Sequence, residues 1–384
     1  MPLARWADAR LAELARVTGS GKIAALDGST LLGERAALHG FVVPGRTSAG
    51  GGCRMFEALD GTIALNLSRV DDRGMLPALV GSEEFDVAND QAVCAQIAAI
   101  TVAELTERGR TLGLAIAGLD EVPQSPASAI TAAGRQRDHN DRPLVLDLSA
   151  LWAGPLAAHL LWLVGAEVIK VESRHRPDTM REGDPALFAL LNEGKANVAL
   201  DLRDANDRTA LLALIRRADV VIEAARPRAL LQLGIDAEAL VHEIPGLVWI
   251  TITGHGTQGE AANWIGFGDD TAVAGGLSAA LREATGTLGF VGDAIGDPLT
   301  GIYTATVAAS ALALGRSTRQ IVSMSGVVAA AVAVKRAEYP QEFMRDLQAW
   351  AAVGRPFPAV AARQSGPVAP LGADNSRLLR QVAI

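Results

Sequence analysis

Through the middle of the chain, short apolar runs alternate with longer segments that have helical periodicity. Four runs have the length and β-branched content of buried strands, and they are Leu144–Ser149, Glu167–Glu172, Val220–Glu223 and Leu247–Thr253. A short extended piece at Asn197–Leu202 and helical patterns at Gly154–Val164 and Ala205–Arg217 fill the intervals. Strand–helix–strand units at this spacing predict a parallel sheet with helices on both faces.

Ligands of such a sheet bind beyond the carboxyl ends of its strands. Those ends are expected at residues 149–155, 172–176, 223–228 and 253–259. The first of them has one glycine, Gly154, whereas the dinucleotide fingerprint needs three so that a pyrophosphate can approach the backbone. The sequence also has no Walker A motif. These features argue against a nicotinamide site or a P-loop nucleotide site.

The first third of the chain has a different pattern. Residues 1–40 are expected to be helical, with a glycine-containing break at residues 18–22. Two strand-like runs, Met55–Ala58 and Thr62–Leu67, are joined by Asp60-Gly61, which predicts a β-hairpin. Helical patterns follow near residues 71–80 and 90–108. Together these elements predict a small α+β domain.

Residues 122–142 are rich in Pro, Ser, Asn, Asp and Arg, a composition typical of a linker. We therefore predict an α/β protein with a small α+β domain over residues 1–125, which includes the N-terminal helical segment. A linker over residues 126–142 then leads to a Rossmann-like ligand-binding and catalytic domain over residues 143–315. Residues 316–384 are expected to complete this large domain.

Composition narrows the class of protein. Apolar residues make up 49% of the 384 residues and charged residues 20%, which is typical of a folded globular chain. The net charge of −8 and the lack of a basic run argue against a nucleic-acid partner. Charges interrupt the first 16 residues, and the apolar runs are too short to span a bilayer convincingly. We therefore expect a cytoplasmic protein without a membrane partner.

The cysteines and histidines do not suggest a metal centre. Cys53 and Cys94 fit neither a disulfide framework nor a metal-ligand spacing. The six histidines are scattered, and no two of them are four residues apart. We therefore expect reduced thiols and no metal site.

Asp297 stands directly before a proline and just before the apolar helical run Ile302–Leu314. This arrangement fits a helix start in which the aspartate caps free N–H groups and Pro298 takes the first helical position. The same geometry would keep a carboxylate ionised at the positive end of a helix dipole, among glycines that let a bulky electrophile approach. The residues alone favour a helix-capping role for Asp297, with a role as nucleophile as the alternative.

Several segments between Leu144 and Ala313 resemble, in the same order, the class III CoA-transferases, the CaiB/BaiF family that also contains alpha-methylacyl-CoA racemase. In chain order the similar segments are Val145–Ser149 with Ala153–Pro155, Gly165–Glu172, Asn192–Lys195 with Val198–Leu202, Ala218–Glu223 with Arg226–Pro227, Thr251–Gly259 and Gly296–Gly301. Short motifs in one shared order rarely arise by chance, so the resemblance is specific.

Two further segments suggest a rearranged order. Gly366–Leu379 looks like the C-terminal end of the family, and Arg54–Arg69 resembles its small domain, which normally follows the large one. Here the small-domain-like segment comes first, which predicts a permutation-like member of the family. Chain ends that lie close together at the surface make such a rearrangement tolerable.

The resemblance implies a function for Asp297. In the family this aspartate attacks the thioester of an acyl-CoA, and the resulting anhydride becomes an aspartyl-CoA thioester. An acceptor carboxylate then takes over the CoA. The implied activity is therefore CoA transfer between carboxylic acids, with coenzyme A as a cosubstrate and no permanently bound cofactor. The resemblance also implies an interlocked homodimer whose small-molecule partners are an acyl-CoA and a carboxylic acid.

Several residues near Asp297 in the sequence or along the sheet edge are candidates for the chemistry. The backbone N–H of Gly296, or those of Gly275 and Gly276, would stabilise a developing oxyanion. Asp293 lies four residues before Asp297, and two such carboxyls raise one another's pKa. His255 follows a predicted strand and would face the pocket. Solvated loop acids and a plain loop histidine are the alternatives.

Coenzyme A requires cations for its phosphates. Lys195, Arg174 and Arg226 lie at predicted strand or loop ends, and the alternative for each is a solvated surface cation. The resemblance adds Leu151 and Trp152 in the first turn and Ala224 after the third strand. Two positions depart from the family pattern. Ser173 stands where the family tends to have arginine, and Ala224-Ala225 stands where it has Asn-Phe, so an arginine fork and an aromatic face are missing.

Two other functions remain open. An alpha-methylacyl-CoA racemase or a related isomerase would need a histidine that aligns with Phe267, and the sequence lacks it. A catalytically degenerate CoA-binding protein is favoured by the rearranged order and the two departures. The retained segment Gly296–Pro298 counts against it.

Overall fold

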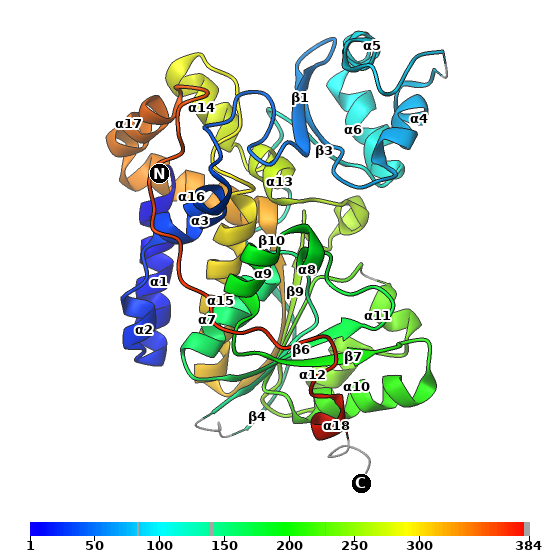
Figure 1. Cartoon of the computed structure of the whole chain (residues 1–384), viewed down its shortest axis with the longest axis vertical. Coiled ribbons are helices and arrows are strands. Elements are labelled where there is room, and N and C mark those ends of the chain that lie inside the picture. The colour runs from blue at the N-terminus through cyan, green and yellow to red at the C-terminus, as the bar shows by residue number, and fades with distance from the viewer. Residues whose placement is uncertain (83, 138–141, 227, 380–384) are drawn as a thin grey trace.

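The structure, a computed structural model, describes residues 1–82, 84–137, 142–226 and 228–379. A large part of the molecule is built around a seven-stranded sheet and a smaller part around a three-stranded sheet (Figure 1). Among the described helices, none is both long and apolar enough to cross a membrane.

The large sheet has the expected parallel core. Its strands are β4 (Ser128–Gln136), β5 (Leu144–Asp147), β6 (Glu167–Ser173), β7 (Ala196–Leu200), β8 (Val220–Glu223), β9 (Val248–Thr253) and β10 (Arg316–Ser323). They lie in the order β4-β10-β9-β8-β5-β6-β7, and all neighbours are parallel except β4 and β10. The predicted Rossmann-like sheet is confirmed. The chain winds from β5 out to β7 and then returns to β8, so the topological switch point lies between β5 and β8.

Helices surround both sheets. In chain order they are α1 (Ala4–Thr18), α2 (Gly21–Ala24), α3 (Gly28–His39), η1 (Asp72–Met75), α4 (Leu76–Val80), α5 (Asp90–Ile97), α6 (Val102–Thr111), α7 (Ala153–Leu163), α8 (Met180–Gly183), α9 (Pro185–Asn192), α10 (Ala205–Arg217), α11 (Ala229–Gln232), α12 (Ala237–Glu243), η2 (Gly259–Asn263), α13 (Gly268–Ala274), α14 (Leu277–Thr285), α15 (Gly296–Leu314), α16 (Met324–Glu338), α17 (Pro340–Trp350) and α18 (Asn375–Leu378).

Successive residues of a strand face different helix layers. Val220 and Ile222 of β8 lie in a core that α7, α15 and α16 share. Val221, between them, packs in a second core with α10 and α12. Side chains alternate along a strand, so a strand with apolar residues at every position is buried on both faces. This is why the central strands are continuous apolar runs in the sequence.

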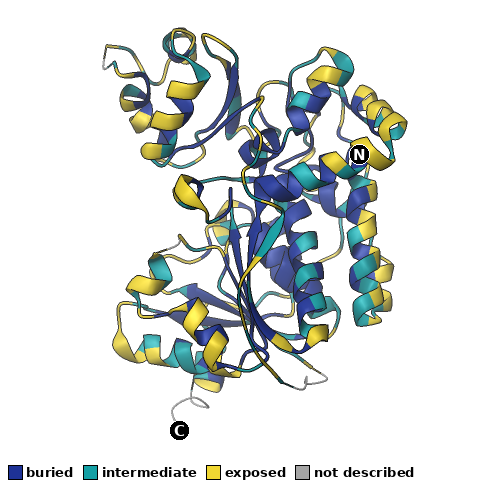
Figure 2. Cartoon of the chain, turned by 180° about the vertical axis from the view of Figure 1, so that it is seen from behind, coloured by how far each residue is buried: buried dark blue, intermediate teal, exposed yellow. Residues whose placement is uncertain are grey.

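The N-terminal helices pack against the large part of the molecule. Leu11 and Leu14 of α1 are buried in the core that contains α7 and α15, and α1 lies beside α15 (Figure 1). Figure 2 shows that the outward side of this helix is exposed. The structure therefore differs from the expected unit of residues 1–125, because the apolar stripe of α1 is covered by helices of the large sheet.

The small sheet contains β1 (Cys53–Glu57), β2 (Thr62–Asn66) and β3 (Ala115–Gly118) in this order. The predicted hairpin is confirmed, since β1 and β2 pair antiparallel. Its loop has four residues, and Ala58 N donates to Gly61 O at 2.8 Å, whereas a two-residue turn was expected. Helices α4, α5 and α6 cover one face of this sheet.

The expected linker contains a strand. Residues 128–136 form β4, which pairs along β10 from Ser128–Val322 to Gln136–Arg316. The composition of this segment does not indicate a strand, because strand formation depends strongly on pairing and side-chain packing with the neighbouring strand. Residues 138–141 lie outside the described residues.

The C-terminal segment packs along the edge of the large sheet. After α17 the chain runs without regular structure to α18 beside β7. Asn197 N donates to Asp374 Oδ2 at 2.9 Å, and Ala199 N donates to Asn375 Oδ1 at 2.9 Å. These side chains satisfy backbone groups that an edge strand would otherwise present to solvent.

Candidate active site

Asp297 lies in the first turn of α15. The helix begins at Gly296, and the N-cap position is held by Ile295 without a side-chain cap. Asp297 N donates to Ala294 O at 2.9 Å. The expectation that Asp297 itself caps the helix is therefore wrong, because the chain enters the helical conformation before it reaches the aspartate. The side chain is free to point toward neighbouring elements.

Three helix starts meet at the Asp297 carboxylate. The backbone N–H groups of Ala153, the first residue of α7, and Gly268, the first residue of α13, stabilise its ionised form. A Cβ atom on Gly268 would overlap Asp297 Oδ2 and the carbonyl oxygen of Ala294, so the close approach requires glycine. Together with α15, two further helices thus direct the positive ends of their backbone dipoles at one carboxylate.

Four aspartates gather here. Asp269 and Asp270 come from α13, Asp293 from the loop before α15, and Asp297 from the first turn of α15. Asp293 is 1% exposed and Asp270 is fully buried, whereas Asp269 and Asp297 are partly accessible. Asp269 and Asp297 are therefore the members of the cluster that keep some exposure to solvent.

Burial makes these carboxyls weak acids. Burial raises the pKa of Asp297 to about 7, the Arg35 guanidinium opposes this, and Asp269 adds to it. The pKa of Asp293 also rises to about 7 through burial, with Arg35 opposing and Asp269 and Asp297 contributing. Burial raises the pKa of Asp270 well above its usual range. Near neutral pH, Asp297 is thus divided between the neutral acid and the nucleophilic carboxylate.

Arg35 supplies the positive charge of the cluster. It extends from α3, and its Nε atom lies 3.2 Å from Asp293 Oδ2. The guanidinium carbon lies 5.2 Å from the centre of the Trp152 ring. Sequence reasoning missed Arg35 because it lies far from the recognisable motifs, in a helix with no local sign of chemistry.

The backbone on two sides of Asp297 is strained. Among the described non-glycine residues, positive φ values occur at Leu3, Leu151 and Ala294. Leu151 (φ 67°) precedes the start of α7, and Ala294 (φ 42°) precedes the start of α15. Ala294 N donates to Asp269 Oδ1 at 3.0 Å, which helps to hold this conformation. Strain of this kind persists where surrounding contacts fix it, and it often accompanies functional sites.

Asp293→Asn should stabilise the protein in a pH-dependent manner. The folded pKa of about 7 lies above the unfolded value of about 3.9. The stability that this carboxyl contributes is therefore fully present below pH 4 and is lost as the pH rises through 7. The variant's advantage should grow over this range and level off at about 1–2 kcal/mol, allowing for the lost ion pair with Arg35.

Urea unfolding at closely spaced pH values measures this difference. Glu260→Gln, at an exposed position, is the matched control and should follow the wild type at each pH. A difference between Asp293→Asn and the wild type that stays constant from pH 4 to pH 8 would contradict a buried weak acid at this position.

His255 lies in the loop after β9. It is 4% exposed, contacts the edge of Trp264 with ring centres 5.7 Å apart, and packs beside Gly266. Burial lowers its pKa to about 4, and the nearby Arg110 contributes. Its Nε2 has no hydrogen-bond partner within the described residues. His255 is therefore a neutral imidazole at neutral pH, and a catalytic role for it stays a prediction.

A crevice opens at the switch point of the sheet. It has a volume of about 410 Å³ and is lined mainly by apolar atoms. Residues 148–150 after β5, 171–173 at the end of β6 and Ala225 after β8 contribute to its walls. Arg176, in the loop after β6, is exposed at the crevice. This is the position at which Rossmann-like sheets bind ligands.

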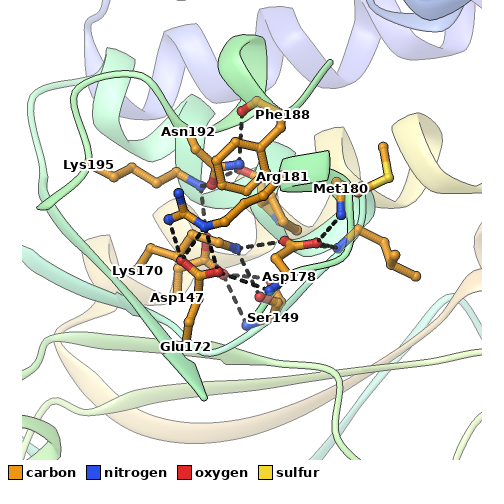
Figure 3. A network of polar contacts seen from close by, with 12 residues as sticks. Asp147, Ser149, Lys170, Glu172, Asp178, Met180, Arg181, Phe188, Asn192 and Lys195 are labelled. Atoms are coloured by element: carbon orange, nitrogen blue, oxygen red, sulfur yellow. Dashed lines mark hydrogen bonds and ion pairs between the residues drawn. The ribbon is translucent and has the colours of Figure 1, made fainter. Parts of the chain in front are cut away.

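Of the residues expected to bind CoA, Lys195 is placed in the protein interior (Figure 3). Its ammonium donates to Asp147 Oδ2 at 2.8 Å, Pro155 O at 2.9 Å and Asn192 Oδ1 at 3.0 Å. An ammonium has three N–H donors, and protein acceptors take all of them. The Lys195 ammonium therefore has no N–H group left for a phosphate of CoA.

The same network extends along the sheet edge (Figure 3). Lys170 lies 3.0 Å from Asp178, which also accepts hydrogen bonds from Leu151 N. Arg181 forms a bidentate pair with Glu172 at the end of β6, with Nε donating to Oε1 and Nη2 to Oε2. These pairs help to fix the turn between β5 and α7. In this turn Leu151 contacts the network through its backbone N–H, and the buried Trp152 ring lies under Arg35.

The other expected CoA ligands are exposed. Arg174 lies 3.3 Å from Asp207 and is directed toward α10. Ala224 follows β8 beside the crevice. Arg226 lines a second pocket of about 200 Å³, together with Glu223 and Arg319. The glycine pair proposed as an oxyanion hole has no free donors, since Gly275 N and Gly276 N bond to Thr271 O and Val273 O.

Comparisons with known proteins find named CoA-transferases among the relatives of this chain. A Succinyl-CoA--D-citramalate CoA-transferase of Chloroflexus aurantiacus is 34% identical over 182 residues, 44% of this chain and 45% of the relative. A Succinate--glutarate CoA-transferase of Agrobacterium fabrum is 32% identical, over 44% of this chain and 45% of the relative. The chain thus spans about half the length of these curated relatives.

A solved structure of a CaiB/BaiF family protein from Brucella suis is 27% identical, covering 52% of this chain and 56% of that chain, with a TM-score of 0.43. The sequence model of CoA-transferase family III matches residues 143–352, more than half of the chain and the part that carries the parallel strands and Asp297. The chain belongs to CoA-transferase family III.

Proposed function

We propose that this protein transfers coenzyme A from an acyl-CoA to a carboxylic acid, with Asp297 as the nucleophile. The observation that carries the proposal is the position of the Asp297 carboxylate: the starts of three helices meet at it, and one of them, at Ala153, ends the turn that borders the crevice. Family membership supplies the reaction class.

The proposed reaction needs no redox step. An Asp297 oxygen attacks the thioester carbonyl, the carbon–sulfur bond breaks, and CoA leaves as a thiolate, which gives an acyl-aspartyl anhydride. The thiolate then attacks the aspartyl carbonyl, which releases the donor carboxylate and leaves an aspartyl-CoA thioester. The acceptor carboxylate attacks this thioester, the carbon–sulfur bond breaks, and CoA thiolate leaves a second anhydride between Asp297 and the acceptor. The thiolate then attacks the acceptor carbonyl of this anhydride, with Asp297 as the leaving group. Acyl-CoA is formed and the Asp297 carboxylate is restored.

The surroundings of Asp297 suit these steps. Partial burial removes water from the nucleophile and raises its pKa, which makes the ionised oxygen more basic. Backbone N–H groups at Ala153 and Gly268 favour negative charge on the carboxylate and on the adjacent tetrahedral intermediate. Asp293 is less suited to attack, since it is 1% exposed and pairs with Arg35.

The crevice at the switch point is the proposed site for the nucleotide end of CoA. Arg176 offers an exposed cation for a phosphate, and the apolar walls offer a surface for adenine. The turn after β5 leads from the crevice wall at Ala150 to Ala153, whose N–H faces Asp297. Three residues span at most about 11 Å, so one extended ligand would reach both places.

Phe267 argues against the racemase alternative. The position that would require a histidine holds a phenyl ring, which can neither donate nor accept a proton, and Arg69 lies above it at 5.9 Å. Several relatives are named for short organic acids, among them succinate, glutarate and oxalate, whereas others are named for cinnamoyl-CoA with phenyllactate or for fatty acyl-CoA. We therefore propose short carboxylic acids as the first substrates to test. A cytoplasmic location and an interlocked homodimer remain predictions.

Trapping the intermediate tests the proposal. The protein is incubated with separate acyl-CoA thioesters, beginning with succinyl-CoA and acetyl-CoA, and then with hydroxylamine, which converts an activated carboxyl into a hydroxamate. Mass spectrometry should find the hydroxamate on the peptide that contains Asp297, and only after incubation with a thioester. Absence of modification with every thioester, or modification of another residue, would contradict covalent transfer through Asp297.

A further inference from the structure

We propose that Arg35 is a positioning residue: its guanidinium, held against Asp293 and Trp152, fixes a positive charge in the aspartate cluster and so keeps Asp297 in its carboxylate form. The inference rests on the proposed nucleophilic role of Asp297. Arg35 lies in α3, outside the matched family segment of residues 143–352. The N-terminal helices would then complete the active site in addition to covering the core.

The structure holds the Arg35 side chain from several sides. Its Nε contacts Asp293 Oδ2 at 3.2 Å, and its guanidinium carbon lies above Trp152. Its terminal nitrogen packs against Gly50, where a Cβ atom would lie 2.6 Å away. An arginine with one face on an aromatic ring and one nitrogen on a carboxylate has little rotational freedom left. Its charge therefore has a fixed position beside Asp293, four residues before Asp297 in the chain.

The helix that carries Arg35 is itself anchored. Leu31, Leu32 and Ala36 of α3 are buried in the main core. The neighbouring Glu34 is fully buried and forms a bidentate pair with Arg363, at 2.7 and 2.8 Å. This pair lies one residue from Arg35 along the helix. It therefore serves as a control: an ion pair that anchors α3 without taking part in the aspartate cluster.

The charges around Asp297 explain why an arginine is needed. Asp269 and Asp270 face it from α13, and Asp293 faces it from the loop before α15. Asp184, at the start of α9, adds negative charge to the cluster and is paired with His39 of α3 at 2.8 Å. Arg35 acts on Asp269, Asp293 and Asp297 together. Without it, burial and mutual repulsion would both favour the protonated acids.

The test is the pH dependence of Asp297 ionisation in Arg35→Gln. Infrared difference spectra of the carboxylate band, taken against Asp297→Asn in the same background, follow this group without any need for turnover. The midpoint should move upward by about one pH unit in Arg35→Gln. Arg35→Lys keeps a positive charge and should return the midpoint most of the way to the wild-type value.

The acid limb of kcat/KM should move by the same amount, so the loss of activity should be largest at low pH and shrink toward pH 9. The control is Arg363→Gln, which breaks the Glu34 pair on the same helix. It should lower the thermal midpoint and leave the Asp297 titration where it is in the wild type. Folding of each variant is checked by circular dichroism.

Two results would overturn the inference. One is a folded Arg35→Gln protein in which the pH midpoint of Asp297 ionisation is unchanged. This result would overturn the inference even if activity fell equally at all pH values or the KM for the acid substrate rose. The other is an equal shift in Arg363→Gln, which would mean that any loosening of α3 has this effect. A wild-type protein without transferase activity would count against the proposed function, while the carboxylate titration would still decide the role of Arg35.

Discussion

Asp297→Asn is expected to reduce CoA transfer by at least about a thousandfold. Asparagine has nearly the same shape, so the contacts at Ala153 and Gly268 and the first turn of α15 should survive, but an amide cannot form the anhydride. No hydroxamate should appear on the peptide after exposure to any acyl-CoA. The measurement is a transfer assay with the best donor and acceptor, together with the trapping experiment.

The same variant should be more stable than the wild type at high pH. The folded pKa of Asp297 is raised to about 7, so the stability linked to its protonated form is present below pH 4 and is lost as the pH rises through 7. The Asp297→Asn variant has no carboxyl group to ionise at this position, so its stability does not fall over this pH range. A gain in stability together with loss of activity is typical of a residue kept for function.

Asp293→Asn is the matched control for this prediction. It removes a carboxyl from the same cluster, four residues earlier, at a position that is 1% exposed. It should retain measurable transfer, because it does not remove the proposed nucleophile. Transfer by Asp297→Asn at the wild-type rate would contradict the mechanism, and so would complete loss in Asp293→Asn with full activity in Asp297→Asn.

Lys195→Met is expected to lower the free energy of unfolding by about 3–5 kcal/mol. The ammonium and its partner Asp147 are both buried, at 2.8 Å. Against the effect of burial, the charges of Lys195 and Lys170 hold the pKa of Asp147 below its usual value. Methionine fills a similar volume but leaves a buried carboxylate and the acceptors at Pro155 and Asn192 without their donor.

Two further variants make this prediction specific. Lys195→Met combined with Asp147→Leu removes both charges and should recover part of the stability, because the remaining penalty is no longer that of an unpaired charge.

Arg176→Ala removes the exposed cation at the crevice and should weaken CoA binding by about tenfold with little change in stability.

Calorimetric titration with CoA and urea unfolding separate the two roles. Lys195→Met protein that is still folded should bind CoA as the wild type does. Loss of CoA binding in a Lys195→Met protein of unchanged stability would show instead that this lysine reaches the phosphates, as its place at a predicted strand end suggested.

The parallel sheet could be predicted because its evidence is local. Strands such as Val220–Glu223 are buried on both faces and are therefore continuous apolar runs, and α10 has the same bounds in the structure as in its sequence pattern. The strand β4 was missed because its alanine-rich sequence pairs with β10, which lies far later in the chain. Ala133 pairs with Thr318, for example. The four-residue loop of the β1–β2 hairpin likewise depends on how the two strands meet.

The sequence by itself determined the parallel α/β core and singled out Asp297, since periodicity and short motifs are properties of neighbouring residues. The tertiary structure decided what surrounds that carboxylate: the starts of α7 and α13, the buried Asp293 and the guanidinium of Arg35. It also decided that Lys195 is an interior ion-pair partner. Burial and charge pairing join residues that are distant along the chain, so their effects on pKa and on ligand access exist only once the helices have packed.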